Sequence, residues 1–304
     1  MGNAFRFGTV GSPHSTPKKP GGTVGGIQRT AQLGLDALEL AWVQSVRVSE
    51  GTCETIRLAA DQQGVTLSVH APYFINLNAS KQEWPKGRKR LMDAAHYGRL
   101  AGATDIVFHP GSYFGNEPTT VLGVALPRLR GCVEELRRDG NDVILRPETM
   151  GKSAMLGSLE DVLTMSKEIE GVQPCLDFAH LHARPGDGSL NSYQEWRDVL
   201  ERVDHALGPR ALKGLHIHLS GIEYGPKGER NHLAFKDADL RMHDLLKALL
   251  DLDCEGRILC ESPVLEVDAL VIQDEWKKLK KRMEKDQRAL HDGQVGVVPG
   301  GGLQ

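Results

Sequence analysis

Six side chains that could bind a metal ion stand at or near the ends of six short apolar runs. Each run closes on one imidazole or one carboxylate, and the six residues are His70, His109, Glu148, Asp177, His218 and Glu261. Successive members are 39, 39, 29, 41 and 43 residues apart. A lone histidine at a strand end is more often an ordinary polar residue with a partner. Six candidates in the same position of successive runs indicate one shared site.

The types of these six residues define the chemistry. Three imidazoles and three carboxylates, without a thiolate, suit Zn²⁺ or Mn²⁺ in a hydrolytic site. A single ion takes three or four protein ligands, so six exceed its need. We therefore expect two or more ions that share a bridging carboxylate.

A second set of candidate ligands lies close to these runs. His180 follows Asp177 by three residues, and Glu229 and His232 lie in a glycine-rich segment after His218. We expect His180, Glu229 and His232 to hold an additional ion.

Two other histidines compete for these roles. His216 and His218 are two residues apart, so both point to the same side of a strand. His218 is nearer the C-terminal end of its run and is the preferred ligand, whereas His216 is expected one layer deeper. His182 is expected beside the ligands or exposed.

Eight short apolar runs alternate with amphipathic, charge-rich segments. The runs span residues 5–10, 37–43, 66–73, 105–111, 142–149, 174–180, 212–220 and 257–263. The segments between them carry apolar residues at i, i+3 and i+4, which predicts helices. Eight strand–helix units predict an α/β protein with a single (β/α)₈ TIM barrel over residues 1–290, in which the C-terminal strand ends converge on one face. Residues 291–304 are predicted to form a flexible tail.

A doubly wound open sheet is the competing arrangement. It would need a glycine-rich phosphate turn after the first strand, and the sequence Val10-Gly11-Ser12-Pro13 does not supply one. Inside a barrel, Arg146 shares the inward face of Glu148, so we expect it to form an interior ion pair. Glu39 is expected to have a similar interior role.

Composition sets broad limits. The 304 residues include 40% hydrophobic and 25% charged residues with a net charge of −3, which is typical of a globular protein and excludes disorder of the whole chain. No apolar run reaches the length of a membrane helix, and the N-terminal residues lack a signal-peptide pattern, so no membrane association is expected. Five cysteines without a CxxC pair suit reduced thiols in a cytoplasmic protein.

The motifs around these residues resemble endonuclease IV, the family 2 apurinic/apyrimidinic (AP) endonucleases of the xylose isomerase-like TIM barrel superfamily. The resemblance extends from about residue 70 to residue 261. It rests on HAPYFINL at 70–77, FHPG at 108–111, ETMGK and LGSLEDVL within 148–163, LDFAH at 176–180, and the loop from 218 to 232.

The resemblance implies a trinuclear zinc site on the barrel, and its ligands can be carried over position by position. They are His70, His109 and Glu148 for the first zinc, Glu148, Asp177, His218 and Glu261 for the second, and His180, Glu229 and His232 for the third. Glu148 would bridge the first two ions. Two or three zinc ions are therefore expected, with Mn²⁺ as the alternative metal.

The resemblance also implies an activity. The chain would hydrolyse the phosphodiester on the 5′ side of an abasic site in double-stranded DNA and leave a 3′-hydroxyl, with a metal-bound hydroxide as nucleophile. Glu148 would hold that nucleophile between two ions, and Glu261 would orient or deprotonate it. No obligate protein partner is expected.

Three residues are candidates for contacts with DNA. Tyr73 matches the aromatic residue that enters the DNA near the lesion in the family, while its neighbours Phe74 and Ile75 are expected to pack inward. Lys227 and Arg230, beside the third set of ligands, are candidate phosphate contacts, although a solvated charged loop explains them equally well.

The chain departs from the family pattern at three places. Phe178-Ala179 stands where Thr-Cys is usual, Ser220-Gly221 where Asn-Asp is usual, and Glu229-Arg230-Asn231-His232 where Asp-Arg-His is usual. These differences predict a divergent subgroup. The alternative function is a sugar isomerase or epimerase of the same superfamily with a single divalent ion, and a non-catalytic DNA-binding barrel is a third interpretation. The number of bound ions separates the nuclease from the isomerase.

Overall fold

The computed structural model describes residues 5–295, and its centre is one parallel sheet of eight strands in the order β6-β4-β3-β2-β1-β12-β9-β8. The strands are β1 (Phe5–Val10), β2 (Ala37–Ala41), β3 (Thr66–His70), β4 (Ala103–Phe108), β6 (Ile144–Pro147), β8 (Cys175–Asp177), β9 (Leu215–Leu219) and β12 (Gly256–Cys260). Parallel bridges Leu145–Val172 and Glu148–Cys175 join the ends of the sheet. The predicted single (β/α)₈ barrel is confirmed, and every predicted apolar run contains most or all of one strand.

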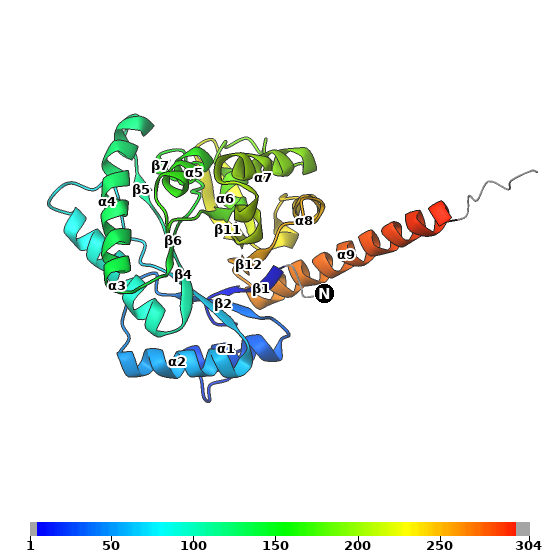
Figure 1. The fold of residues 1–304 in the computed structure, drawn as a ribbon, viewed down its shortest axis with the longest axis horizontal. Helices are drawn as coiled ribbons and strands as arrows, with labels where there is room; N and C mark the ends of the chain where they lie inside the picture. Colours follow the sequence, from blue (N-terminus) through cyan, green and yellow to red (C-terminus); the bar gives the residue numbers. More distant parts are fainter. Residues whose placement is uncertain (1–4, 296–304) are drawn as a thin grey trace, which may run out of the picture.

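Helices surround the barrel (Figure 1). They are α1 (Gly22–Gln32), α2 (Glu50–Gln63), α3 (Trp84–Leu100), α4 (Pro118–Arg138), α5 (Leu159–Glu168), α6 (Phe178–Ala183), α7 (Tyr193–Leu207), α8 (Met242–Asp251) and α9 (Glu266–Val295). Figure 1 shows α9 extending away from the barrel. This helix continues five residues into the tail predicted for 291–304, and residues 296–304 lie outside the described part of the chain.

Local sequence signals set several helix boundaries. Ser158 and Ser192 each form a capping box with the acidic residue three positions later, which satisfies free backbone N–H groups at the start of α5 and α7. Gly64 ends α2 in the left-handed conformation with φ of 67°. Within residues 5–295, none of the helices combines the length and the hydropathy that a membrane span requires.

Two small antiparallel sheets lie outside the barrel. β5 (Gly111–Ser112) pairs with β7 (Met155–Leu156), and β10 (Gly221–Gly225) pairs with β11 (Gly228–Leu233). The second pair is a hairpin where the sequence suggested a glycine-rich loop. It follows β9 directly, so it stands at the C-terminal end of the barrel, where the candidate ligands are.

The barrel interior contains a buried ion cluster at the opposite end of the strands. Asp105 is 4% exposed, and its carboxylate lies 2.6 Å from Nε of Arg146 and 2.9 Å from Nη2 of Arg257. Burial would raise the pKa of Asp105, but the two guanidinium groups hold it well below its usual range. The interior ion pair predicted for Arg146 is therefore confirmed.

Replacing Asp105 by Asn should lower the free energy of unfolding by about 3 kcal/mol, because two guanidinium groups would then lack their counter-charge inside the barrel. Denaturant titration at pH 7 measures the change. The matched control is Asp93→Asn, which removes an exposed pair with Lys89 and should cost less than about 1 kcal/mol. A loss for Asp105→Asn as small as that of the control would contradict this interpretation.

Candidate metal centre

The strand ends bring the six predicted ligands together on one face of the barrel. His70 and Asp177 end β3 and β8, and His218 lies inside β9. The other three directly follow the last residues of β4, β6 and β12. Parallel strands in a closed barrel end at the same face, so these side chains converge. Their ligand atoms form two groups, each within 4.8 Å, composed of His70, His109 and Glu148 and of Glu148, Asp177, His218 and Glu261.

Glu148 belongs to both groups and is 1% exposed. Its Oε2 lies 3.3 Å from Nε2 of His70 and 3.3 Å from Nε2 of His109. Its Oε1 faces the other side, 3.3 Å from Nδ1 of His180 and 3.5 Å from Nδ1 of His218. Each carboxylate oxygen of Glu148 therefore faces a different set of imidazoles. This is the arrangement expected of a carboxylate that bridges two metal ions.

Backbone carbonyl groups fix the orientation of two candidate histidines. Nδ1 of His70 lies 3.0 Å from the carbonyl oxygen of Ala71, and Nδ1 of His180 lies 2.9 Å from that of Thr149. A carbonyl oxygen can only accept, so each Nδ1 carries the proton and each Nε2 keeps its lone pair in the neutral ring. Metal-binding histidines are commonly held in this way.

The side chains of the third predicted ligand set also lie close together, but their grouping differs from the prediction in one respect. Nε2 of His180 lies 3.2 Å from Nε2 of His232 and 3.6 Å from Oε2 of Glu229. The ligand atoms that gather within 4.8 Å are those of Asp177, His180 and His232. Glu229 thus stands at the edge of this cluster, and Asp177 contributes to it as well as to the second group.

Several buried polar atoms of the centre lack hydrogen-bond partners. Both carboxylate oxygens of Glu148, Oδ2 of Asp177 and Nδ1 of His218 are unsatisfied among the described residues. Burial raises the pKa of Asp177 to about 6. Burial opposes ionisation of Glu148 too, but the imidazoles led by His109 hold its pKa well below the usual range. Unsatisfied buried groups are costly, and divalent cations would satisfy this set, so the residues present fit metal ions.

Glu39 supports the centre from one layer below. Its Oε1 lies 2.9 Å from Nε2 of His218, and its Oε2 lies 3.0 Å from Nε2 of His216 and accepts a 2.7 Å hydrogen bond from Ser68. The contact turns Nδ1 of His218 toward Glu261, 3.3 Å away. The interior role predicted for Glu39 is confirmed, and His216 lies deeper than His218.

His182 is fully buried and lies away from the candidate ligands. Its Nδ1 lies 2.9 Å from the carbonyl oxygen of Leu190, and its Nε2 lies 2.9 Å from Oδ1 of Asp239. It therefore ties two surface segments to α6 instead of facing the centre.

Tyr73 packs directly on the centre. Its ring stacks on His109 with the centroids 5.0 Å apart and meets His70 edge-on at 5.4 Å. Burial and the charge of Glu261 raise the pKa of Tyr73 to about 12, so its hydroxyl keeps its proton. The expectation for Phe74 was wrong, because its side chain is 61% exposed and only Ile75 turns into the core.

One cation at the centre was not among those expected from the sequence. Lys227 is exposed in the β10–β11 turn, and Arg230 lies 3.3 Å from the carboxylate of Glu223. Lys152, which sequence patterns did not single out, lines the approximately 260 Å³ pocket above the candidate ligands. It is placed there because its backbone pairs with Gly228 of the hairpin. Its position in the motif ETMGK, four residues after Glu148, was the signal available in the sequence.

The sequence model of the xylose isomerase-like TIM barrel family matches residues 27–288. The chain belongs to this family. It is 34% identical to an uncharacterized protein of Methanocaldococcus jannaschii over 274 residues, 90% of this chain and 97% of that protein. Endonuclease 4 of Thermus thermophilus is 27% identical over 204 residues, 65% of this chain and 71% of that protein. A probable endonuclease 4 of Staphylococcus carnosus is 30% identical over 190 residues, 58% of this chain and 61% of that protein.

Solved structures share the fold of this family member. An endonuclease IV from Thermus thermophilus superposes with a TM-score of 0.68 at 22% identity, covering 91% of this chain and 99% of that one. A D-tagatose 3-epimerase-like protein gives 0.67 at 19% identity, covering 87% and 97%. At these identities the similarity establishes the fold, and the two neighbours do not separate the activities.

The hairpin explains how the extra residue in Glu229-Arg230-Asn231-His232 is accommodated. Asn231 pairs with Glu223 and Glu229 pairs with Tyr224, so Arg230 is an extra residue in a β-bulge. In a regular strand, residues three apart point to opposite faces. Because of the bulge, the side chains of Glu229 and His232 point to the same face of the hairpin, and both line the pocket.

Replacing Glu148 by Gln should reduce the number of tightly bound zinc ions per chain from at least two to at most one, because both ligand groups lose their shared anionic oxygen. Elemental analysis after dialysis against zinc and gel filtration measures the ratio. His243→Asn is the control, since it removes an imidazole paired with Glu275 on the surface and should leave the ratio unchanged. A ratio unaltered by Glu148→Gln would exclude the bridging role.

Proposed function

We propose that this protein is a metal-dependent DNA repair endonuclease that hydrolyses the phosphodiester on the 5′ side of an abasic site in duplex DNA and leaves a 3′-hydroxyl. The observation that carries the proposal is the shared position of Glu148, whose two oxygens face separate sets of imidazoles. A site of this kind is suited to two or three ions. The endonuclease 4 relatives support the assignment of substrate class.

Zinc would be held by the three ligand sets described above, with His180, Glu229, His232 and Asp177 around the outermost position. Bound zinc supplies a water of lowered pKa and positive charge next to the phosphodiester. The carboxylate of Glu261 faces the centre and is partly open to solvent, so it is placed to accept the proton of the attacking water. Lys152 and Lys227 would bind the phosphates on either side.

The single-metal sugar epimerase is the alternative. Such a site needs about four ligands around one ion, which the group of Glu148, Asp177, His218 and Glu261 alone would satisfy. It leaves the His70–His109 pair and the His180–His232 pair without a role. The convergence of these additional imidazoles, His70 and His109 on one oxygen of Glu148 and His180 on His232, therefore favours the nuclease.

The decisive assay uses a labelled duplex with one abasic site. The purified protein should cut the strand 5′ to the lesion, and extension of the product by a DNA polymerase should show a free 3′-hydroxyl. Prolonged treatment with a strong chelator should abolish cutting, and Zn²⁺ should restore it. Full activity after verified removal of the metal, or no cutting by the zinc-loaded protein, would overturn the proposed function.

Tyr73→Ala should weaken binding to abasic duplex about 5- to 100-fold, because the ring offsets the stacking lost when the nucleotide leaves the helix. Fluorescence anisotropy measures the affinity. Since the ring also stacks on His109, zinc content is measured in parallel. Tyr73→Phe, which keeps the ring, should bind normally. A Tyr73→Ala protein that binds the lesion normally but melts several degrees lower would show that the ring serves the core.

A further inference from the structure

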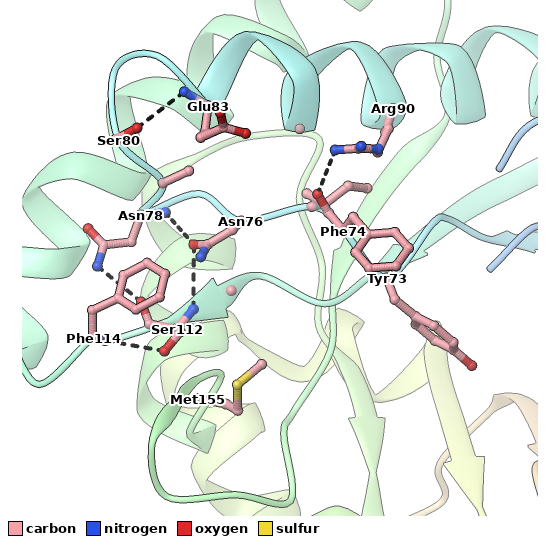
Figure 2. A pocket seen from close by; sticks show the side chains of 14 residues that line it. Tyr73, Phe74, Asn76, Asn78, Ser80, Glu83, Arg90, Ser112, Phe114 and Met155 are labelled. Carbon is pink, nitrogen blue, oxygen red and sulfur yellow. Dashed lines mark hydrogen bonds between the residues drawn. The ribbon is translucent and has the colours of Figure 1, made fainter. Parts of the chain in front are cut away.

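A second pocket of approximately 670 Å³ adjoins the metal centre (Figure 2). Tyr73 and Met155 line both this pocket and the smaller one above the candidate ligands. The segment after β3, the start of α3 and the β5 loop form the rest of its wall. The two pockets therefore share part of their wall, and a chain molecule bound at the candidate metal centre has a second cavity beside it.

Two unusually exposed phenyl rings border this pocket. Phe74 is 61% exposed and Phe114 is 66% exposed, the highest values among the large apolar side chains of residues 5–289, whose exposure the structure describes. In the view of Figure 2 the two rings lie on opposite sides of the pocket. A phenyl ring left in water does not contribute the roughly 1.5–3 kcal/mol of stabilising free energy that its burial would provide. Phe114 also has a φ of 51°, a left-handed conformation that bulky residues rarely adopt.

The polar groups between the rings are fixed and have unused hydrogen-bonding capacity. Oδ1 of Asn76 accepts hydrogen bonds from the backbone N–H groups of Asn78 and Ser112, at 2.8 and 3.4 Å. Nδ2 of Asn78 donates to the carbonyl oxygen of Ser112 at 3.0 Å. These bonds leave the amino group of Asn76 as a donor and Oδ1 of Asn78 as an acceptor. An amide donor and an amide acceptor are groups that can form hydrogen bonds with the edge of a nucleobase.

Arg90 supplies a positive charge at the rim. Its guanidinium group donates a 3.1 Å hydrogen bond to the carbonyl oxygen of Phe74 and lies 5.7 Å from the centre of the Phe74 ring. Among the described residues it makes no ion pair with a carboxylate. A fixed guanidinium group of this type is suited to a phosphate oxygen.

We propose that this pocket binds one unstacked nucleobase of the nucleic acid whose phosphodiester lies at the metal centre. The inference rests on the proposed function. The base would stack on Phe114, its edge would meet Asn76 and Asn78, and its phosphate would meet Arg90. A simple anion would not use the two rings. The protein would thus hold a nucleotide next to the lesion out of the helix, in addition to the abasic sugar itself.

The test is a base-deletion scan measured by fluorescence anisotropy with the zinc-loaded full chain. The duplex carries an abasic analogue with a phosphorothioate at the scissile linkage, and each neighbouring base is removed in turn, on both strands. For the wild type, removal of one particular base should weaken binding about 10-fold. Phe114→Ala should weaken binding to the intact duplex by a similar factor, and removal of that base should then have no further effect.

Controls separate this result from general damage. Leu58→Ala removes a comparably exposed apolar side chain on α2 and should leave affinity unchanged, whereas Phe114→Tyr should retain it. Melting temperatures of all variants should agree within about a degree. Two results would overturn the base pocket alone. In the first, the wild type cuts abasic DNA but no base removal weakens binding. In the second, removal of the base weakens binding by Phe114→Ala as much as it weakens binding by the wild type. A protein that neither binds nor cuts the duplex would overturn the proposed function as well.

Discussion

The carboxylate of Glu148 is almost completely buried, and an isolated charge in such a position would be lost to protonation. Four imidazoles from four other segments of the barrel approach its two oxygens and keep it ionised. No single strand can supply them, because side chains that face inward at one level come from different strands. Closure of the barrel is therefore a condition for the charge state of Glu148, and through it for any metal binding.

The same interior holds a second buried charge cluster that behaves differently. At the other end of the strands, Asp105 is matched by Arg146 and Arg257, and the guanidinium group of Arg146 also donates to two backbone carbonyl oxygens. That cluster satisfies itself and needs no ligand. The cluster around Glu148 keeps unsatisfied buried atoms. The difference between the two ends separates a structural ion cluster from a candidate metal site, although Arg146 and Glu148 are only two residues apart.

The barrel and the positions of the candidate ligands were predictable because both follow from local sequence patterns. Each apolar run contains most or all of a strand, and the residue that closes the run is carried to the C-terminal face by the architecture. The exposure of Phe74 and the position of Lys152 were not predictable in this way. Phe74 alternates with the buried Ile75 in an irregular segment, and Lys152 is placed by pairing with a distant hairpin. Contacts between loops leave no periodic signal in the sequence.

The hairpin shows how such contacts constrain the site. A side chain at Gly151 would meet the side chains of Glu229 and His180, with its Cβ only 2.7 Å from that of Glu229. Gly151 and the bulge at Arg230 therefore act together, since one provides the space and the other turns Glu229 into it. The extra residue Arg230 is thus absorbed inside the hairpin, and Nε2 of His180 lies 3.2 Å from Nε2 of His232. Loop geometry positions this outer part of the candidate site, whereas the barrel itself positions the candidate ligands at the strand ends.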